Sequence, residues 1–110
     1  MITTHVLDTA RGRPAQGVPV VLERAGEEGW RELGRGATDA DGRLRDLLPA
    51  GTPVADGRYR LTFDTGAYFR ARGEAAFYPE VAVVFTVAGD DHHHVPLLLS
   101  PFGYSTYRGS

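Results

Sequence analysis

The stretch that most constrains the fold is residues 57–64, where large apolar side chains alternate with arginine and threonine. In a β-strand, successive side chains point to opposite faces of the sheet. Tyr59, Leu61 and Phe63 therefore share one face, and the side chains between them point the other way. This alternation predicts a strand with one buried face and one solvated face.

Turn-forming residues cut the rest of the chain into similarly short segments. Its 110 residues include 14 glycines and 7 prolines, a content typical of a β-rich chain. We expect further strands over residues 2–9, 18–24, 30–37, 43–47, 81–88, 93–100 and 104–108. The one plausible helix spans residues 65–72, with Thr65 as its N-cap and Gly73 closing it. The pattern predicts an all-β fold, a single domain over residues 1–110 built as an eight-stranded antiparallel β-sandwich with one short helix.

Charge and composition argue against several classes of function. The net charge of −2 is not that of a general nucleic-acid binder, which would carry a basic patch. The chain has no cysteine, which excludes disulfides and thiolate chemistry and fits a reducing compartment. It also has no long apolar segment suited to a membrane helix, and residues 1–5 do not read as the start of a signal peptide. We therefore expect a cytoplasmic protein with neither a nucleic-acid nor a membrane partner.

Three of the four histidines, His92, His93 and His94, directly precede the strongest apolar run of the chain. His92 and His94 are two residues apart, so on a strand they face the same side while His93 faces the other. The pair could lie in a solvated turn, act as functional imidazoles or bind a metal. Zinc usually needs three or four ligands, and without cysteine only His5 and scattered acids could complete the set. The residues alone leave these alternatives open.

Other candidate residues are unremarkable one at a time. His5 is a polar residue on the first expected strand, and Arg43 follows the tight turn at Asp41-Gly42. The C-terminal Tyr-Arg-Gly-Ser could be a frayed end. These signals gain weight only if one fold brings them together.

Five motifs, taken together and in order, resemble those of the transthyretin-related 5-hydroxyisourate hydrolases. They are His5 to Asp8, Gly12 to Ala15 with Gly17 to Val20, Thr38 to Arg43, Phe77 to Glu80, and His92 to Ser110. The last motif is the most specific, because transthyretin itself, the thyroid-hormone carrier, lacks the terminal Tyr-Arg-Gly-Ser and the histidines. Two positions depart from the family pattern: His93 stands where an aromatic residue is usual, and Phe102 where tyrosine is common.

The resemblance implies a sandwich of the transthyretin type that assembles into a homotetramer, a dimer of dimers. Two active sites would open onto a channel between the dimers, lined by the first strand and the last two. The expected substrate is 5-hydroxyisourate, an intermediate of urate catabolism. Hydrolysis at a cyclic amide would give 2-oxo-4-hydroxy-4-carboxy-5-ureidoimidazoline, with no metal and no cofactor.

The resemblance also assigns roles to individual residues. It implies that His5 and His94 transfer protons, since imidazole titrates near working pH, but it does not say which is the general base. The third catalytic residue, Arg43, would face the developing oxyanion or the negative charge of the substrate. The expected substrate-binding residues are His92, Ser105, Tyr107, Arg108, Gly109 and Ser110.

Three other functions compete with hydrolysis. A non-catalytic small-molecule carrier of the transthyretin kind would have no use for the histidines, Arg43 or the polar tail. A strand-borne metal-binding module predicts zinc or nickel retained after purification. A plain sandwich used for protein contacts predicts no turnover.

Overall fold

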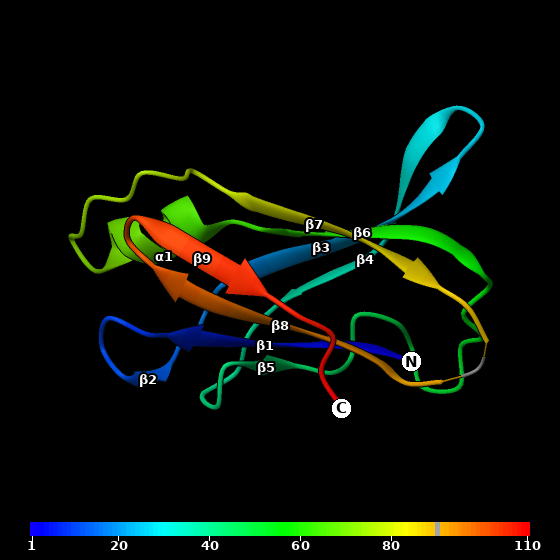
Figure 1. The fold of residues 1–110 in the computed structure, drawn as a ribbon, viewed down its shortest axis with the longest axis horizontal. Helices are drawn as coiled ribbons and strands as arrows, with labels where there is room; N and C mark the ends of the chain where they lie inside the picture. Colours follow the sequence, from blue (N-terminus) through cyan, green and yellow to red (C-terminus); the bar gives the residue numbers. More distant parts are fainter. Residues whose placement is uncertain (90) are drawn as a thin grey trace.

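The computed structural model describes residues 1–89 and 91–110, which form two facing β-sheets and one short helix (Figure 1). The first sheet contains β1 (Ile2–Asp8), β2 (Arg13–Pro14), β5 (Arg43–Leu44), β8 (His93–Ser100) and β9 (Gly103–Thr106). Its order is β2-β1-β8-β9, and β5 also pairs with β1. The second sheet contains β3 (Pro19–Gly26), β4 (Gly29–Ala37), β6 (Gly57–Phe63) and β7 (Val81–Val87), in the order β4-β3-β6-β7. The helix α1 spans Thr65–Ala71.

The predicted β-sandwich is confirmed, and its apolar core lies between the two sheets. Tyr59, Leu61 and Phe63 on β6 are 2%, 0% and 0% exposed, so the alternation identified the buried face correctly. Val6 on β1 and Leu97 on β8 belong to the same buried cluster. Fully burying a side chain of this size stabilises a fold by roughly 1.5–3 kcal/mol. The core therefore fixes which faces of β1 and β8 point outward.

One pairing differs from the predicted antiparallel arrangement, because β1 and β8 run parallel. Their register sets Thr3 beside His94 and His5 beside Pro96. Parallel neighbours cannot be joined by a tight hairpin and need a long crossover, which the second sheet supplies here. Side chains alternate in the same way along parallel and antiparallel strands, so the sequence pattern did not distinguish the two.

The extents of three segments also differ from the prediction. β5 ends at Leu44, and the chain beyond it leaves the sheet so that Leu47 can join the core at 3% exposure. β9 ends at Thr106, so the last residues lie outside the strand. The expected turn at residues 11–17 contains the two-residue strand β2, which pairs with the end of β1.

The N-cap of helix α1 lies one residue before the predicted one. Asp64, not Thr65, is the N-cap, because its side chain accepts a hydrogen bond from the Ala67 N–H at 3.0 Å. Thr65 is instead fully buried. Gly73 closes the helix as predicted: its φ is +69°, and its N–H donates to the Arg70 carbonyl at 3.0 Å. In the part of the chain that the structure describes, no helix is long and apolar enough to cross a membrane.

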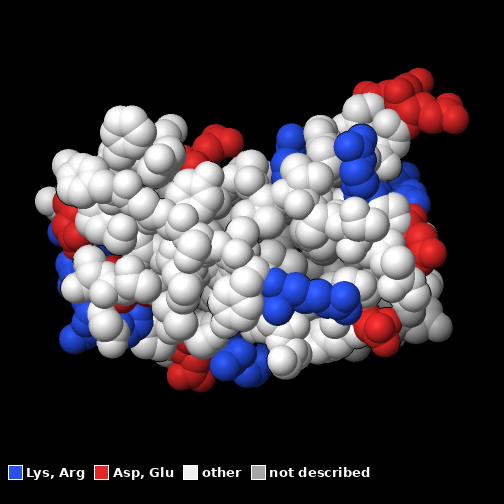
Figure 2. Space-filling model, viewed as in Figure 1, with Lys and Arg blue, Asp and Glu red and all other residues white. Residues whose placement is uncertain are grey.

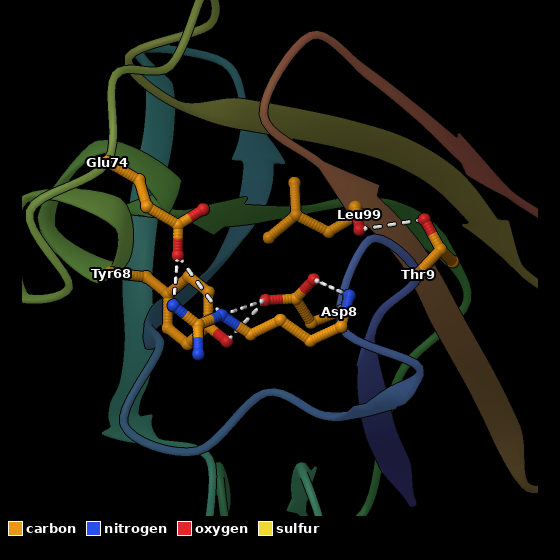
Figure 3. Close-up of polar contacts among 6 residues, drawn as sticks. Asp8, Thr9, Tyr68, Glu74 and Leu99 are labelled. Carbon is orange, nitrogen blue, oxygen red and sulfur yellow. Dashed lines mark hydrogen bonds and ion pairs between the residues drawn. The ribbon is translucent and has the colours of Figure 1, made fainter.

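A buried carboxylate ties α1 to the end of β1 (Figure 3). Asp8 is 1% exposed and accepts hydrogen bonds from the Tyr68 hydroxyl at 2.7 Å and from the Arg11 N–H at 3.1 Å. The Arg11 guanidinium lies between Asp8 and Glu74 and pairs with both. Burial, together with the hydrogen bond to Asp8, raises the pKa of Tyr68 to about 12. These contacts fix the end of β1 that lies away from the histidines.

Replacing Tyr68 by phenylalanine should destabilise the fold, because the substitution removes a donor from a buried carboxylate. We expect the free energy of unfolding at neutral pH to fall by about 1–3 kcal/mol in urea denaturation. The matched control is Tyr104→Phe, since Tyr104 is 43% exposed. This control should leave the free energy of unfolding unchanged.

The same substitution should change the dependence of stability on alkaline pH. The pKa of Tyr68 is raised from 10.0 to about 12, so the unfolded chain loses this proton first and wild-type stability falls as pH rises through that window. The chain has no lysine to mask the effect. Tyr68→Phe should lose this alkaline fall in stability. If Tyr68→Phe instead kept the wild-type stability and pH dependence, the hydrogen bond to Asp8 would be unimportant.

Candidate active site

A tight turn presents Arg43 beside His5. The Asp39 carboxylate accepts hydrogen bonds from the Asp41 and Arg43 N–H groups, each at 2.9 Å, and the Arg43 contact is the first cause of the lowered pKa of Asp39. Gly42 has a φ of +75°, and a Cβ at that position would lie 2.4 Å from the Val6 carbonyl oxygen. Glycine is therefore required in this turn. The turn leads directly into β5, where Arg43 pairs with His5 on β1.

His5 is held in one tautomer by the same turn. Its Nε2 lies 2.9 Å from the main-chain oxygen of Asp41. A carbonyl oxygen only accepts hydrogen bonds, so Nε2 must carry the proton. In the neutral imidazole, Nδ1 of His5 is then the nitrogen that can accept a proton.

The parallel pairing of β1 and β8 gathers two further histidines around Thr3. The Thr3 hydroxyl lies 2.7 Å from His92 Nε2 and 2.8 Å from His94 Nδ1. The two imidazole rings are 6.1 Å apart. As predicted, His93 faces the opposite side and is buried at 5% exposure.

The C-terminal tail continues beyond the end of β9 and crosses β8 (Figure 1). The Gly109 N–H donates to the His94 carbonyl at 2.8 Å, which forms an isolated bridge between the tail and the strand. A Cβ on Gly109 would lie 2.5 Å from His94 Cδ2 and 3.0 Å from Pro96 Cγ. Glycine at this position thus lets the tail contact the His94 ring.

These elements enclose a small cavity of about 120 Å³. Both ends of the chain, β5 and the start of β8 contribute to its lining: Met1, Thr3, Thr4, Arg43, Arg45, His92, His94 and Ser110. Across residues 1–89 and 91–110, neither Arg43 nor Arg45 forms an ion pair with a carboxylate. The cavity therefore combines imidazoles with arginine side chains whose charge is not neutralised by an ion pair, a lining suited to an anionic or polarised small molecule.

The electrostatics of the cavity favour a neutral His94. Burial lowers the pKa of the His94 imidazole, and the positive charge of Arg43, followed by His92 and His5, lowers it further. A hydrogen bond with the Thr3 main chain acts in the opposite direction. A neutral imidazole at working pH can accept a proton from water, which is the requirement for a general base.

The structure brings some of the predicted site residues together and separates others. His92, His94, Arg43 and Ser110 line the same cavity, and His5 lies close enough to affect the pKa of His94. Ser105 is exposed on β9 and pairs with Leu98, outside the lining of this cavity.

Tyr107 and Arg108 do not line this cavity. They line a mainly apolar pocket of about 230 Å³ that shares His94 with it, and whose other residues come from β7, the start of β8 and the end of β9.

Sequence reasoning missed four residues of the cavity, Met1, Thr3, Thr4 and Arg45. Thr3 and Arg45 each lie two positions from a predicted catalytic residue, Thr3 from His5 and Arg45 from Arg43. The alternation of a strand could have identified Thr3 as a neighbour of His5 on the same face. Arg45 lies just after β5, where that rule does not hold.

Among residues 1–89 and 91–110, no group of three or more His, Cys, Asp or Glu side chains is arranged to hold a metal ion. His92 and His94 instead share the Thr3 hydroxyl. Metal independence stays a prediction for the activity assay.

Comparison with known proteins identifies the family. A model of the HIUase/transthyretin family matches residues 2–109. The chain belongs to this family. It is 50% identical to the 5-hydroxyisourate hydrolase of Mus musculus over 112 residues, covering 99% of this chain and 94% of that protein. The resemblance found in the motifs is thereby confirmed.

Solved structures of the family include both enzymes and carriers. The 5-hydroxyisourate hydrolase of Klebsiella pneumoniae matches with a TM-score of 0.87 and 40% identity, covering 99% of this chain and 98% of that one. Sea bream transthyretin, solved in complex with thyroxine, matches with a TM-score of 0.89 and 34% identity, covering 98% and 93% of the two chains. The shared fold therefore does not decide between the two functions, and the site must.

Replacing Gly109 by alanine should disturb His94 while the sandwich stays folded. The new Cβ would collide with the His94 ring, so either the tail or the ring must move. We expect the His94 imidazole resonances to shift in NMR spectra, while circular dichroism stays unchanged. Gly103→Ala is the control, because its Cβ would meet only Ser100 Oγ at 3.7 Å. Unchanged His94 resonances in Gly109→Ala would show that the tail does not contact the ring.

Proposed function

We propose that this chain hydrolyses 5-hydroxyisourate by opening its six-membered ring at the cyclic amide. The observation that carries the proposal is the convergence of a neutral His94, the cationic Arg43 and the chain terminus on one small cavity. Amide hydrolysis needs an activated water, a stabilised oxyanion and a protonated leaving nitrogen. The family relatives that bear the hydrolase name match essentially the whole chain, which supports the same reaction here.

The imidazoles supply the proton transfers in this proposal. His94 is kept neutral by burial and by Arg43, so it can take a proton from the attacking water. His5, with its Nε2 proton bound to the Asp41 carbonyl, presents Nδ1 as a second acceptor. General acid–base catalysis of this kind typically contributes about 10²–10⁴-fold. The imidazolium formed at His94 can then pass the same proton to the leaving nitrogen, and His5 remains available as a second acceptor.

Arg43 supplies the positive charge in this proposal. Its position opposite His5 is fixed by the turn that contains Gly42, and it is free of ion pairs within the described chain. A fixed cation that need not reorganise is suited to an oxyanion that develops in the transition state. Its planar guanidinium can also bind the planar substrate in a defined orientation.

The tail forms one wall of the proposed site. A Cβ at Gly109 would collide with the His94 ring, and Ser110 brings its hydroxyl to the cavity. Ser105, Tyr107 and Arg108 do not line this cavity, although Tyr107 and Arg108 line the pocket that shares His94 with it. We propose that their contacts with substrate form when several chains assemble.

The proposed assembly is a homotetramer, a dimer of dimers. Two edge strands, β7 and β9, end their sheets on neighbouring surfaces, and Val84 and Tyr104 on them are 52% and 43% exposed. Figure 2 shows that much of the face over these strands carries no charged side chain. Exposed edge strands of this kind favour pairing with another chain. Light scattering should give a mass of four chains.

Hydrolysis is preferred over transport because of the polar cavity. A carrier for an apolar ligand gains nothing from two imidazoles and two arginines without ion pairs, which are costly to desolvate.

The cytoplasmic location expected from the sequence also stays a proposal, which fractionation of cells that express the natural chain would test.

The activity should depend strongly on Arg43. Freshly generated 5-hydroxyisourate should decay faster with the protein than without it, as followed by ultraviolet absorbance. Arg43→Gln should lower kcat by about 10²–10³-fold, the usual cost of removing one oxyanion stabiliser. Arg43→Lys should restore little, because a point charge lacks the planar fork.

The control for Arg43 is Arg13→Gln on the exposed strand β2, which should be fully active. A chelator should leave the rate unchanged. Activity of Arg43→Gln within a few-fold of wild type would remove Arg43 from the mechanism, and loss of activity with the chelator, restored by zinc, would favour a metal site.

A further inference from the structure

Thr3 is a buried polar residue that lines the cavity, and neither the motifs nor the family match gives it a role. It is 4% exposed, on the outward face of β1, and its register partner on β8 is His94. Its hydroxyl lies at hydrogen-bond distance from a nitrogen of His92 and from a nitrogen of His94. One buried hydroxyl thus joins two imidazoles.

The single proton of the Thr3 hydroxyl couples the tautomers of His92 and His94. A threonine hydroxyl has one proton to donate and can also accept, so it cannot donate to both nitrogens. Within residues 1–89 and 91–110, the hydroxyl makes no other hydrogen bond that could take its proton. One imidazole must therefore accept from Thr3 while the other donates to it. The tautomer of His92 consequently determines the tautomer of His94.

We propose that Thr3 is a positioning residue for the hydrolysis: its hydroxyl donates to His92 Nε2 and accepts from His94 Nδ1–H. This inference rests on the proposed function. It leaves His94 Nε2 unprotonated and ready to take the proton of the attacking water. The proton bonds to Nε2, the resulting hydroxide oxygen attacks the amide carbon, and the Thr3 hydrogen bonds need not change.

The alternative direction would disable His94 as a base. If Thr3 donated to Nδ1, Nε2 of the neutral ring would already hold the proton, and the lone pair would be occupied by Thr3. The chosen direction is the one that leaves Nε2 of His94 free, because Nδ1 is the nitrogen that lies 2.8 Å from the Thr3 hydroxyl. Orienting partners of this kind are known to fix the tautomer of catalytic histidines.

The experiment compares three variants with the wild-type protein. Thr3→Val removes the hydroxyl with little change in shape, and Thr3→Ser keeps it. The matched control is Thr38→Val, because Thr38 is also 4% exposed and its hydroxyl also makes two hydrogen bonds, from the Val18 N–H and to the Ala15 carbonyl. Thr38 lies outside the cavity, so its loss reports only the stability cost of such a substitution.

We expect Thr3→Val to lower kcat by about 10–100-fold, the usual effect of losing an orienting partner, with KM nearly unchanged. Thr3→Ser and Thr38→Val should keep kcat close to the wild-type value. Nitrogen-15 NMR of the neutral imidazoles should show His94 protonated at Nδ1 in the wild type and a mixture of tautomers in Thr3→Val. A purely structural role for Thr3 would not move this signature.

Two results would overturn the proposal: a wild-type His94 protonated at Nε2, or a folded Thr3→Val with wild-type kcat. If Thr3→Val does not fold, the tautomer of wild-type His94 still decides. Wild-type protein without hydrolase activity would refute the proposed function, whereas the NMR signature would continue to test the Thr3 arrangement by itself.

Discussion

The site depends on the parallel pairing of β1 with β8. This pairing joins the first strand of the chain to one of the last, in a register that sets Thr3 against His94. A shift of one residue would turn every side chain of a strand to the opposite face. The register is held because Val6 and Leu97 must stay in the core, and both are fully buried. The apolar side of the two strands thereby fixes the positions of the polar groups on their outer side.

The close approach of the imidazoles and Arg43 in the cavity creates the chemistry and also carries an electrostatic cost. Placing His94 beside Arg43 and two further imidazoles, in a partly buried position, disfavours its charged form. A site that kept every imidazole ionised would be less stable, because like charges in a small cavity repel one another. Keeping His94 neutral relieves the repulsion and provides a base. The tail covers this arrangement, and the absence of a side chain at Gly109 allows it to do so.

The sequence predicted those features that depend on local periodicity. The buried face of β6 and the opposite orientations of His93 and His94 follow from the alternation of a strand, and both agree with the structure. Alternation cannot give strand direction, so the parallel pair was not foreseen. Thr3 was overlooked because its role arises from contacts with residues at the far end of the sequence.

The measurement that tests this account most directly is the pKa of the His94 imidazole, followed by NMR as a function of pH. The account predicts a pKa below the ordinary histidine value, because of burial and of Arg43, and a rise towards that value in Arg43→Gln. A His94 pKa at or above the ordinary value, or one that does not respond to the loss of Arg43, would contradict the claim that the fold keeps this histidine neutral beside a fixed cation.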